Sequence, residues 1–304
     1  MISGSCVRVI EFYRRNEPVF SFEFFLPKTP QTKEAFRTML EQVQGLKPHF
    51  VTLTYGAGGS AREATVEMAG VLKNRFGFET VMHLTCIAHT RIEIDQILQE
   101  ARRLGIGSIM ALRGDLPKDG SAIAVGQRDF KYARDLVEHL RRQNDWCIGV
   151  AGYPEGHPEC PSKEEDLRHL KEKVEAGADY VVTQLFFDNR DYFDFVRRAR
   201  AAGIHLPIVP GIMPIANFEQ IRKFASMCGA KIPPALIERL SPVQNDPQAV
   251  ASIGVEHATR QCLELLKGGA PGIHFYTLNK SQATQEILRR IKHAADKTSS
   301  DIRR

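Results

Sequence analysis

The sequence has little of what marks metal-binding, secreted or membrane proteins. Its six cysteines are scattered and none belongs to a C-x-x-C pair, which argues against a zinc site and against a disulfide framework. No apolar run approaches the roughly 18 residues that a transmembrane helix needs. The N-terminal stretch alternates charged and apolar residues and has no signal-peptide core. We therefore predict a cytoplasmic protein without a membrane partner.

A large excess of charge of one sign is also missing. The formal net charge of +5 is too small to indicate nucleic acid, so we predict no nucleic-acid partner. Much of that excess comes from residues 289–304, which we expect to form a frayed basic tail. The 43% hydrophobic and 25% charged content is typical of a globular protein. At 304 residues the chain fits one α/β barrel, and we predict a single domain over residues 1–304.

Strand-like and helix-like segments alternate along the chain. We expect short apolar strands at 19–25, 50–54, 80–85, 108–112, 146–152, 180–185, 208–211 and 273–278. The helices that follow them are expected at 31–45, 60–75, 92–104, 130–142, 162–176, 192–202, 218–227 and 282–294. A short N-terminal helix over 6–14 precedes the first strand, and extra helices fill 234–266 before the eighth.

Eight strand–helix units predict an α/β protein built as a (β/α)₈ TIM barrel. The strands are short apolar runs, as is typical of parallel strands covered by helices. A doubly wound sheet could hold as many units, but it would normally carry G-x-G-x-x-G after its first strand. This chain has Phe-Phe-Leu-Pro-Lys at that point, which favours the barrel.

Glu23 stands in the middle of an aromatic strand, Val19–Phe25. Strand alternation places it on the same face as Ser21 and opposite Phe22 and Phe24. Burying a carboxylate there is costly unless it is paired or protonated. One interpretation is a structural ion pair. The other is a general acid with a raised pKa in an active site.

Polar residues gather where the predicted strands end, at the mouth of the barrel. The turn from Gly56 to Ser60 could bind phosphate, although such turns are more often connectors. No G-x-S-x-G and no metal-ligand spacing appears. Six polar strand ends together predict a site at this mouth. Its members include Glu23, Thr54, Tyr55, His83, Thr85, Arg113, Asp115, Tyr153, His157, Gln184 and Lys280.

The helix after the fifth strand carries Asp166, His169 and Lys173 on one stripe. A solvated face is the simplest interpretation of such a stripe. The alternative is a platform for a nucleotide or phosphate at the rim of the barrel.

The accumulated motifs resemble the methylenetetrahydrofolate reductase family, flavin enzymes of one-carbon metabolism. The resemblance implies a compact, bacterial-type enzyme whose (β/α)₈ barrel holds FAD at its mouth. The matching stretches run in order from the first strand to the eighth: Phe22–Phe25, Thr54–Ala57, His83–Cys86, Ala111–Asp115, Tyr153–Glu155, His157–Glu159, Thr183–Gln184, Phe187–Asp188, Pro210–Ile212 and His274–Asn279.

The same resemblance implies a ping-pong reaction. NADH or NADPH reduces the flavin and leaves, and 5,10-methylenetetrahydrofolate then accepts a hydride from flavin N5 to give 5-methyltetrahydrofolate. Glu23 matches the general acid that protonates the folate nitrogen. Asp115 matches the aspartate that stabilises the cationic folate iminium. The family resemblance also suggests a homo-oligomer, a dimer or a tetramer.

Further positions match family positions that bind the cofactor or the substrate. Thr54 and Gln184 are also candidates for the nicotinamide. The FAD set is Thr54, Tyr55, Ala57, His83, Leu112, Arg113, Gly114, Asp115, Tyr132, Ala133, Tyr153, His157, Asp166, His169 and Lys173. The folate set is Glu23, Asp115, Gln184, Gln220, Phe224 and Lys280.

The sequence departs from the commonest family pattern at Leu26, Lys28, His169, Glu172 and Lys280. A carboxylate at Glu172 would repel a phosphate, so the diphosphate contacts are the part of the match most in question. Lys280 keeps the charge of the usual arginine but loses its bidentate fork.

Two alternatives stay open at this point. A flavin-free pterin-binding barrel that transfers methyl groups also needs a pocket carboxylate, but it gives no role to Tyr55, Arg113 or Asp166. A partner-dependent reductase subunit would take electrons from another donor. The choice between NADH and NADPH is likewise open.

Overall fold

The computed structural model describes residues 8–55, 62–115, 129–143 and 145–302, with side chains up to residue 294. Its strands are β1 Val19–Phe24, β2 Phe50–Leu53, β3 Thr80–Thr85, β4 Ser108–Leu112, β5 Cys147–Gly152, β6 Tyr180–Thr183, β7 Ile208–Val209, β8 Gly211–Ile212 and β9 Gly272–Tyr276. Its α-helices are α1 Val9–Tyr13, α2 Pro30–Gln44, α3 Arg62–Asn74, α4 Arg91–Arg103, α5 Ala133–Arg142, α6 Lys163–Glu175, α7 Asn189–Ala201, α8 Phe218–Cys228, α9 Pro234–Leu240, α10 Pro247–Lys267 and α11 Gln282–Ile302.

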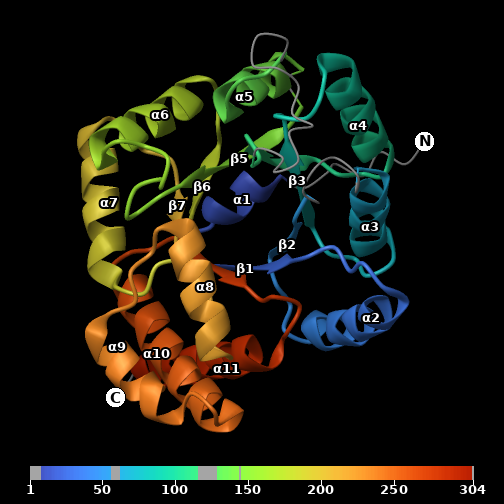
Figure 1. Cartoon of the computed structure of the whole chain (residues 1–304). Coiled ribbons are helices and arrows are strands. Elements are labelled where there is room, and N and C mark those ends of the chain that lie inside the picture. The colour runs from blue at the N-terminus through green and yellow to red at the C-terminus, as the bar shows by residue number, and fades with distance from the viewer. Residues whose placement is uncertain (1–7, 56–61, 116–128, 144, 303–304) are drawn as a thin grey trace.

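All strand pairs are parallel, and the sheet closes on itself. Its order is β7-β6-β5-β4-β3-β2-β1-β9-β8. The two end strands, β7 and β8, are successive in the chain and separated by Pro210 alone. β7 pairs with β6, and β8 pairs with β9, so this bent segment joins the two edges. Helices surround the ring (Figure 1). The predicted (β/α)₈ barrel is confirmed, and a doubly wound sheet is excluded.

Several predicted boundaries differ from the structure. The predicted seventh strand, 208–211, is split because Pro210 has no N–H to donate to the ladder. β6 ends at Thr183 and α7 begins at Asn189, where Asp188 accepts a hydrogen bond from the amide of Arg190 as the N-cap. The predicted frayed tail is wrong as well, since α11 continues to Ile302. Ser60, where the predicted helix 60–75 begins, lies outside the described residues.

Side chains cap the N-termini of several helices. Ser162 accepts a hydrogen bond from the amide of Glu165 at 3.1 Å and so caps α6. The Glu165 carboxylate does not return a hydrogen bond to Ser162; it pairs with Arg168 on the next turn. The extra helical region before the last strand is divided into α9, a 3₁₀ turn at Ser241–Val243 and α10.

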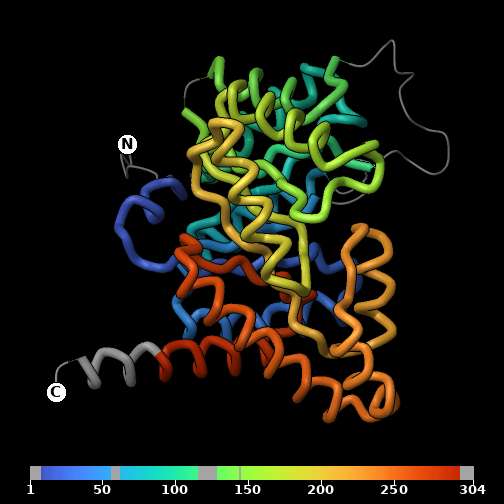
Figure 2. The backbone as a smooth tube through the Cα atoms, turned by 90° about the vertical axis from the view of Figure 1, so that its left-hand side faces the viewer, coloured from blue at the N-terminus to red at the C-terminus, as the bar shows by residue number. Residues whose placement is uncertain are grey.

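The lower end of the barrel is an apolar plug. Side chains from seven strands, β1 to β7, meet inside it, and α1 closes it with Val9, which is fully buried. The Tyr13 ring lies 5.9 Å from the ring of Tyr180. Gly149 leaves space for that tyrosine, because a Cβ there would come within 2.5 Å of its ring. α1 and α8 lie at opposite ends of the barrel (Figure 2).

The main core lies between the barrel wall and the surrounding helices. Phe22 and Phe24 point into it from β1 and are fully buried, as alternation predicts. Met39, Leu40 and Val43 meet them from α2. In the part of the chain that the structure describes, none of the helices combines the length and the apolar character that crossing a bilayer requires.

Candidate active site

Glu23 points into the barrel near its mouth. Glu23 is only 7% exposed. It is therefore largely shielded from bulk water, and a molecule bound at the mouth could contact the small part that is open. Three polar side chains approach its Oε2 atom: Thr52 Oγ1 at 3.4 Å, His83 Nε2 at 3.4 Å and His274 Nε2 at 3.5 Å. They come from β2, β3 and β9, so a ring of strands fixes the position of this carboxyl group.

The pKa of Glu23 reflects opposing effects. Burial raises it, while the neighbouring His83 imidazole and the hydrogen bonds from His274 and Thr52 lower it. The lowering contributions together prevail, and the pKa lies below its ordinary value. The raised pKa predicted from the aromatic strand is therefore wrong for the free protein. The two imidazoles and the Thr52 hydroxyl stabilise the carboxylate against the effect of burial.

His83 contributes a buried imidazole to this site. Burial lowers its pKa, with Glu23 opposing that shift. Its Nε2 atom has no hydrogen-bond partner within the described residues, although Glu23 Oε2 lies at 3.4 Å. Unsatisfied buried polar atoms are uncommon and need an explanation. A ligand that reaches the mouth would supply one.

The chain leaving β1 is tied to the chain leaving β9. Asn279 accepts a hydrogen bond from the amide of Phe25 at 2.9 Å and donates one to its carbonyl at 2.8 Å. Asn279 has φ 58°, in the left-handed region, which asparagine tolerates better than most residues. Thr277 Oγ1 donates to the carbonyl of Glu23 at 2.7 Å. The backbone carrying the acid is thus held from the last strand.

A second group of residues lies after β4 and β5. Arg113 donates to Glu159 Oε2 at 2.7 Å and, through Nε, to the carbonyl of Gly114 at 3.1 Å. Gly114 has φ 87°, and a Cβ there would come within 2.9 Å of the Thr85 side chain. This turn therefore needs glycine. Asp115 follows it and is exposed.

Asp166 and Lys173 turn from α6 toward the end of β5. Lys173 Nζ donates to the carbonyl of Ala151 at 2.6 Å, and burial lowers the pKa of this lysine to about 8. Burial raises the pKa of Asp166, whose carboxylate accepts a hydrogen bond from the backbone of His157. These two residues are part of the rim. For them the solvated-face interpretation does not hold.

Aromatic rings line the same side of the mouth. Tyr153 and His157 meet edge to face with ring centroids 4.6 Å apart. Tyr132, which is 53% exposed, lies over His169 at 6.4 Å with nearly parallel rings. Exposed rings beside cations can receive a planar heterocycle with an anionic tail.

Glu172 is paired with positively charged neighbours. Its carboxylate contacts Arg168 on the same helix and Arg134 Nη1 on α5 at 3.3 Å. His169 Nδ1 lies 3.3 Å from it as well. The two guanidinium groups are shared with Glu165 and Asp135.

A pocket on the other side of the mouth brings together Gln220 and Phe224 from α8 with Lys280 after β9. These three predicted folate positions are 60 residues apart in sequence at the widest, Gln220 to Lys280, and only the fold joins them. Gln184 lies at the end of β6, where its side chain accepts a hydrogen bond from the amide of Leu185 at 2.8 Å. Burial raises the pKa of the Cys228 thiol on α8, and the charge of Asp115 adds to this effect. Asp115 therefore lies near α8.

Some predicted residues are placed differently. The Tyr55 side chain is buried in the main core, with its hydroxyl 2.9 Å from His89 Nε2. Ala57 lies outside the described residues. Thr54 follows β2 and Leu112 ends β4, both half-buried, and Ala133 begins α5.

Sequence reasoning missed the residues that face Glu23 from the other strands. His274 and Tyr276 belong to a quoted motif, yet neither was selected as a site residue. His274 Nδ1 is 2.8 Å from Ser21 Oγ, and Thr52 Oγ1 approaches Glu23. Alternation counted from the barrel interior would have found His274 and Thr52. No group of three or more potential metal ligands occurs among the described side chains.

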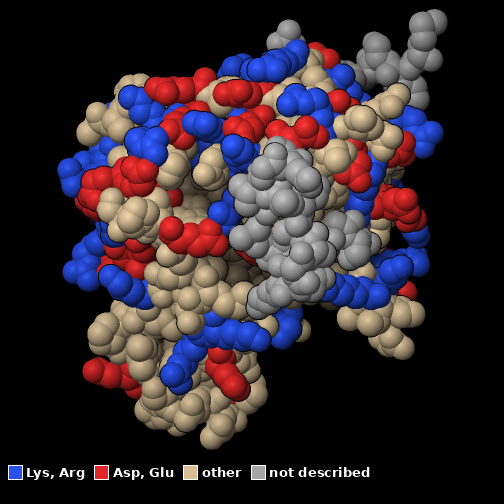
Figure 3. Space-filling view, turned by 45° about the horizontal axis from the view of Figure 1, so that its top comes forward, with Lys and Arg blue, Asp and Glu red and all other residues tan. Residues whose placement is uncertain are grey.

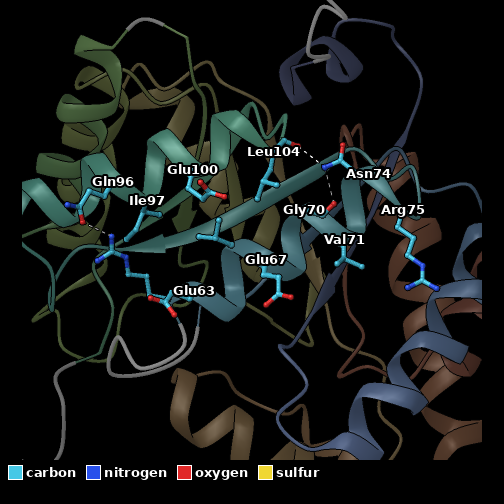
Figure 4. A pocket seen from close by; sticks show the side chains of 12 residues that line it. Glu63, Glu67, Gly70, Val71, Asn74, Arg75, Gln96, Ile97, Glu100 and Leu104 are labelled. Carbon is cyan, nitrogen blue, oxygen red and sulfur yellow. Dashed lines mark hydrogen bonds between the residues drawn. The ribbon is translucent and has the colours of Figure 1, made fainter. Parts of the chain in front are cut away.

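A further pocket lies on the outer wall, between α3 and α4 (Figure 4). Val66, Ile97 and Leu104 form part of its lining, and Glu63, Glu67 and Glu100 add carboxylates. Arg62 donates to Gln96 across it at 2.9 Å. None of the residues gathered at the mouth lines it, so we separate it from the candidate site.

The charges on the surface shown in Figure 3 are mixed. Lysine and arginine side chains alternate with aspartate and glutamate around a central hollow (Figure 3). Such a face does not attract a polyanion over a wide area.

The chain matches the family model described as methylenetetrahydrofolate reductase over residues 8–292. It is 40% identical over 267 residues to 5,10-methylenetetrahydrofolate reductase from Pectobacterium carotovorum, with 88% of each chain covered. The Escherichia coli enzyme of that name is 39% identical, again with 88% of each covered.

Eukaryotic relatives are longer. The chain is 40% identical over 285 residues to methylenetetrahydrofolate reductase (NADH) 1 of Arabidopsis thaliana, covering 90% of this chain and 48% of that protein. It thus spans about half the length of this plant relative and most of the bacterial ones. A solved structure, an uncharacterized Clostridium thermocellum protein that binds two copies of 5-methyl-5,6,7,8-tetrahydrofolic acid, aligns with TM-score 0.61 at 13% identity, over 93% of this chain and 97% of that one. At that identity the match supports the fold alone.

Proposed function

The chain belongs to the methylenetetrahydrofolate reductase family of oxidoreductases, and from this premise we propose that it reduces 5,10-methylenetetrahydrofolate to 5-methyltetrahydrofolate. We further propose FAD as its cofactor, NADH or NADPH as the electron donor and ping-pong kinetics. The observation that carries the proposal is Glu23, a carboxyl group 7% exposed at the mouth and held by three strands.

The rim residues fit FAD in chemistry. Tyr132, Tyr153 and His157 offer aromatic surface for planar rings. Arg113 and Lys173 supply cations on the same side of the mouth for a diphosphate. The unpartnered, buried Nε2 of His83 faces the same interior. FAD, when bound, would accept a hydride from the nicotinamide and return it to the folate.

Glu23 would deliver the proton that opens the folate methylene bridge. A general acid must be protonated when its substrate is bound, whereas the carboxyl of the free protein is held ionised. Covering the mouth with ring systems removes water from above Glu23 and favours its neutral form. Glu23 would therefore become protonated, and able to act as a general acid, when the substrate binds.

The opposite side of the mouth suits the folate. Phe224 can contact the pterin, while Gln220 and Lys280 line the same pocket with polar ends. Asp115 would stabilise the cation that forms when the methylene bridge opens, because its charge is held at the exposed end of the β4 turn. Gln184 would have to release its local hydrogen bond to reach substrate.

Of the two nicotinamide donors we favour NADH, because the Arabidopsis thaliana relative is named as an NADH enzyme. We also propose that the protein forms a dimer or a tetramer, which the mass of the purified protein in solution would test.

Chromophore analysis and steady-state kinetics test the proposal. The purified protein should release FAD on denaturation, and initial rates at several fixed NADH concentrations should give parallel double-reciprocal lines against methylenetetrahydrofolate. Parallel runs with NADPH identify the donor. A protein that stays colourless after incubation with FAD would contradict the reductase proposal and favour the flavin-free methyltransferase. A yellow protein that neither nucleotide reduces would contradict the proposed donor and favour a partner redox protein.

A further inference from the structure

Ser21, His274 and Glu23 form a continuous polar line inside the barrel. Ser21 Oγ lies 2.8 Å from His274 Nδ1, and His274 Nε2 lies 3.5 Å from Glu23 Oε2. Ser21 and His274 are 0% and 1% exposed, so water does not compete for these contacts. Ser21 lies deeper in the barrel than Glu23, two residues earlier on the same strand.

The depth of Ser21 excludes it as a nucleophile. The histidine lies between its hydroxyl and the carboxyl group at the mouth, so substrate cannot reach it. Its hydroxyl can instead fix the tautomer of His274. When Ser21 donates to Nδ1, the proton of the neutral ring is on Nε2 and faces Glu23. A carboxylate requires a donor on that side, so this direction satisfies all three groups.

We propose that Ser21 and His274 are positioning residues for the general acid: Ser21 O–H donates to His274 Nδ1, and His274 Nε2–H donates to Glu23 Oε2. This inference rests on the proposed function of Glu23. The relay orients the carboxyl group and favours its ionised form until substrate covers the mouth. Residues that orient a reacting group through a second hydrogen bond are a recurrent feature of active sites.

Other groups face the same carboxyl and set the background. His83 approaches Oε2 from β3 at 3.4 Å, and Thr52 approaches it from β2 at 3.4 Å. Tyr276 is close enough for the charge of Glu23 to add to the effect of burial in raising the pKa of its phenol. Its hydroxyl donates to the carbonyl of Thr183 at 2.7 Å. The relay is distinct from these contacts because it alone continues to a buried hydroxyl below.

The tautomer can be measured without turnover. Long-range proton–nitrogen correlation spectra of protein labelled with ¹⁵N-histidine distinguish the two neutral forms, and His274→Phe assigns the signals by deleting them. We expect the Nε2–H form for His274 in the wild type and a mixture in Ser21→Ala. An Nδ1–H form in the wild type would overturn the proposal, because the ring would then present a lone pair to the carboxylate.

The folate half-reaction gives a second readout. Reduced enzyme is mixed with methylenetetrahydrofolate across a pH series, and flavin reoxidation is followed. Losing a hydrogen bond to the carboxylate should move the alkaline limb of this rate upward by about one pH unit in His274→Phe and by less in Ser21→Ala. Flavin reduction by NADH should not change in either variant, because that step needs no proton from Glu23.

Ser108→Ala is the matched control, since it also removes a fully buried hydroxyl from a barrel strand but one on β4 opposite Cys147. Its pH profile should match the wild type. Superimposable profiles for wild type and Ser21→Ala, with the Nε2–H form retained, would overturn the relay. An equal loss in both half-reactions would show a structural defect and would also overturn it. If the wild type binds flavin but does not reduce the folate, the proposed function fails instead, and the spectra still report on the relay.

Discussion

The two ends of the barrel are built by the same strands, but the side chains inside the base are apolar and those inside the mouth are polar. At the base, β1, β2 and β3 contribute Val19, Phe50 and Val81 to an apolar plug. Toward the mouth, the inward-facing residues of β1 continue from Val19 to Ser21 and Glu23. The next inward-facing residue is Thr52 on β2 and His83 on β3. All of these side chains point inward, and a shift along each strand changes the interior from a packed core to a polar site.

The difference teaches what each end requires. The base is stabilised by burial of apolar surface and by close packing. The mouth buries polar groups, each of which costs free energy unless a partner satisfies it. Hydrogen bonds from Thr52 and His274 offset part of that cost, and His83 keeps an unsatisfied nitrogen. Changes at the mouth should therefore alter function, and changes at the base should alter stability.

The largest expected effect is on catalysis at the mouth. Glu23→Gln removes the transferable proton and keeps the shape, so the folate half-reaction should slow by about 10²- to 10⁴-fold. Flavin content and flavin reduction by NADH should be close to those of the wild type. Stopped-flow absorbance measures both half-reactions. Folate reduction at near wild-type rate would show that Glu23 is not the acid.

At the base, Tyr180→Ala should lower the free energy of unfolding by ~3–5 kcal/mol, because it empties a fully buried ring position. Tyr180→Phe is the control. The tyrosine hydroxyl has no hydrogen-bond partner among the described residues, so its removal should change stability by less than about 1 kcal/mol. Urea unfolding measures both variants. A change in the folate rate without loss of stability would break the division between base and mouth.

The Lys173 ammonium should matter for flavin affinity. Lys173→Met is expected to weaken FAD binding by about tenfold or more, the scale of one hydrogen bond to a charged group. Since the pKa of Lys173 is lowered to about 8, the lysine is charged below that pH and neutral above it. Wild-type affinity should therefore fall as pH rises through 8, and the variant should lack this step.

Lys171→Met, on the exposed side of the same helix, is the control for that titration because Lys171 pairs only with Glu175 in the described contacts. Fluorescence quenching of added FAD measures both. Equal pH dependence in Lys173→Met and the wild type would remove Lys173 from the flavin site.

The smallest effect is expected for Glu172→Gln. Arg168 and Arg134 already pair with this carboxylate, and pairs of this exposure contribute little. Flavin affinity should change by less than about threefold. A gain of tenfold or more would show that Glu172 repels the diphosphate, as the sequence alone suggested.

The sequence predicted the barrel and which side chains of the first strand share a face, because strand alternation and strand–helix spacing are local. It could not predict the break at Pro210, where one proline separates two short pairings that close the ring. Nor could it predict the environment of Glu23. His274 is 251 residues away in sequence and approaches the carboxyl only because β1 pairs with β9.

Tyr55 and Glu23 show why motif positions are less informative than side-chain directions. The family match places Tyr55 at the cofactor, but alternation after Thr52 turns its ring outward to His89. The family match also identifies Glu23 as the acid, but it does not identify the side chains that surround the carboxyl group. The raised pKa expected from an aromatic strand gave way to a lowered one because two imidazoles and a threonine surround the carboxyl.

The most direct test of the account is an anaerobic visible spectrum of the purified protein. It is recorded first alone, then after one equivalent of NADH and then after methylenetetrahydrofolate. We predict flavin bands that bleach with NADH and return with the folate, which would identify cofactor, donor and acceptor in one sample. Bands that bleach with NADH and stay bleached with the folate would contradict the proposal that the mouth around Glu23 is a folate-reducing site.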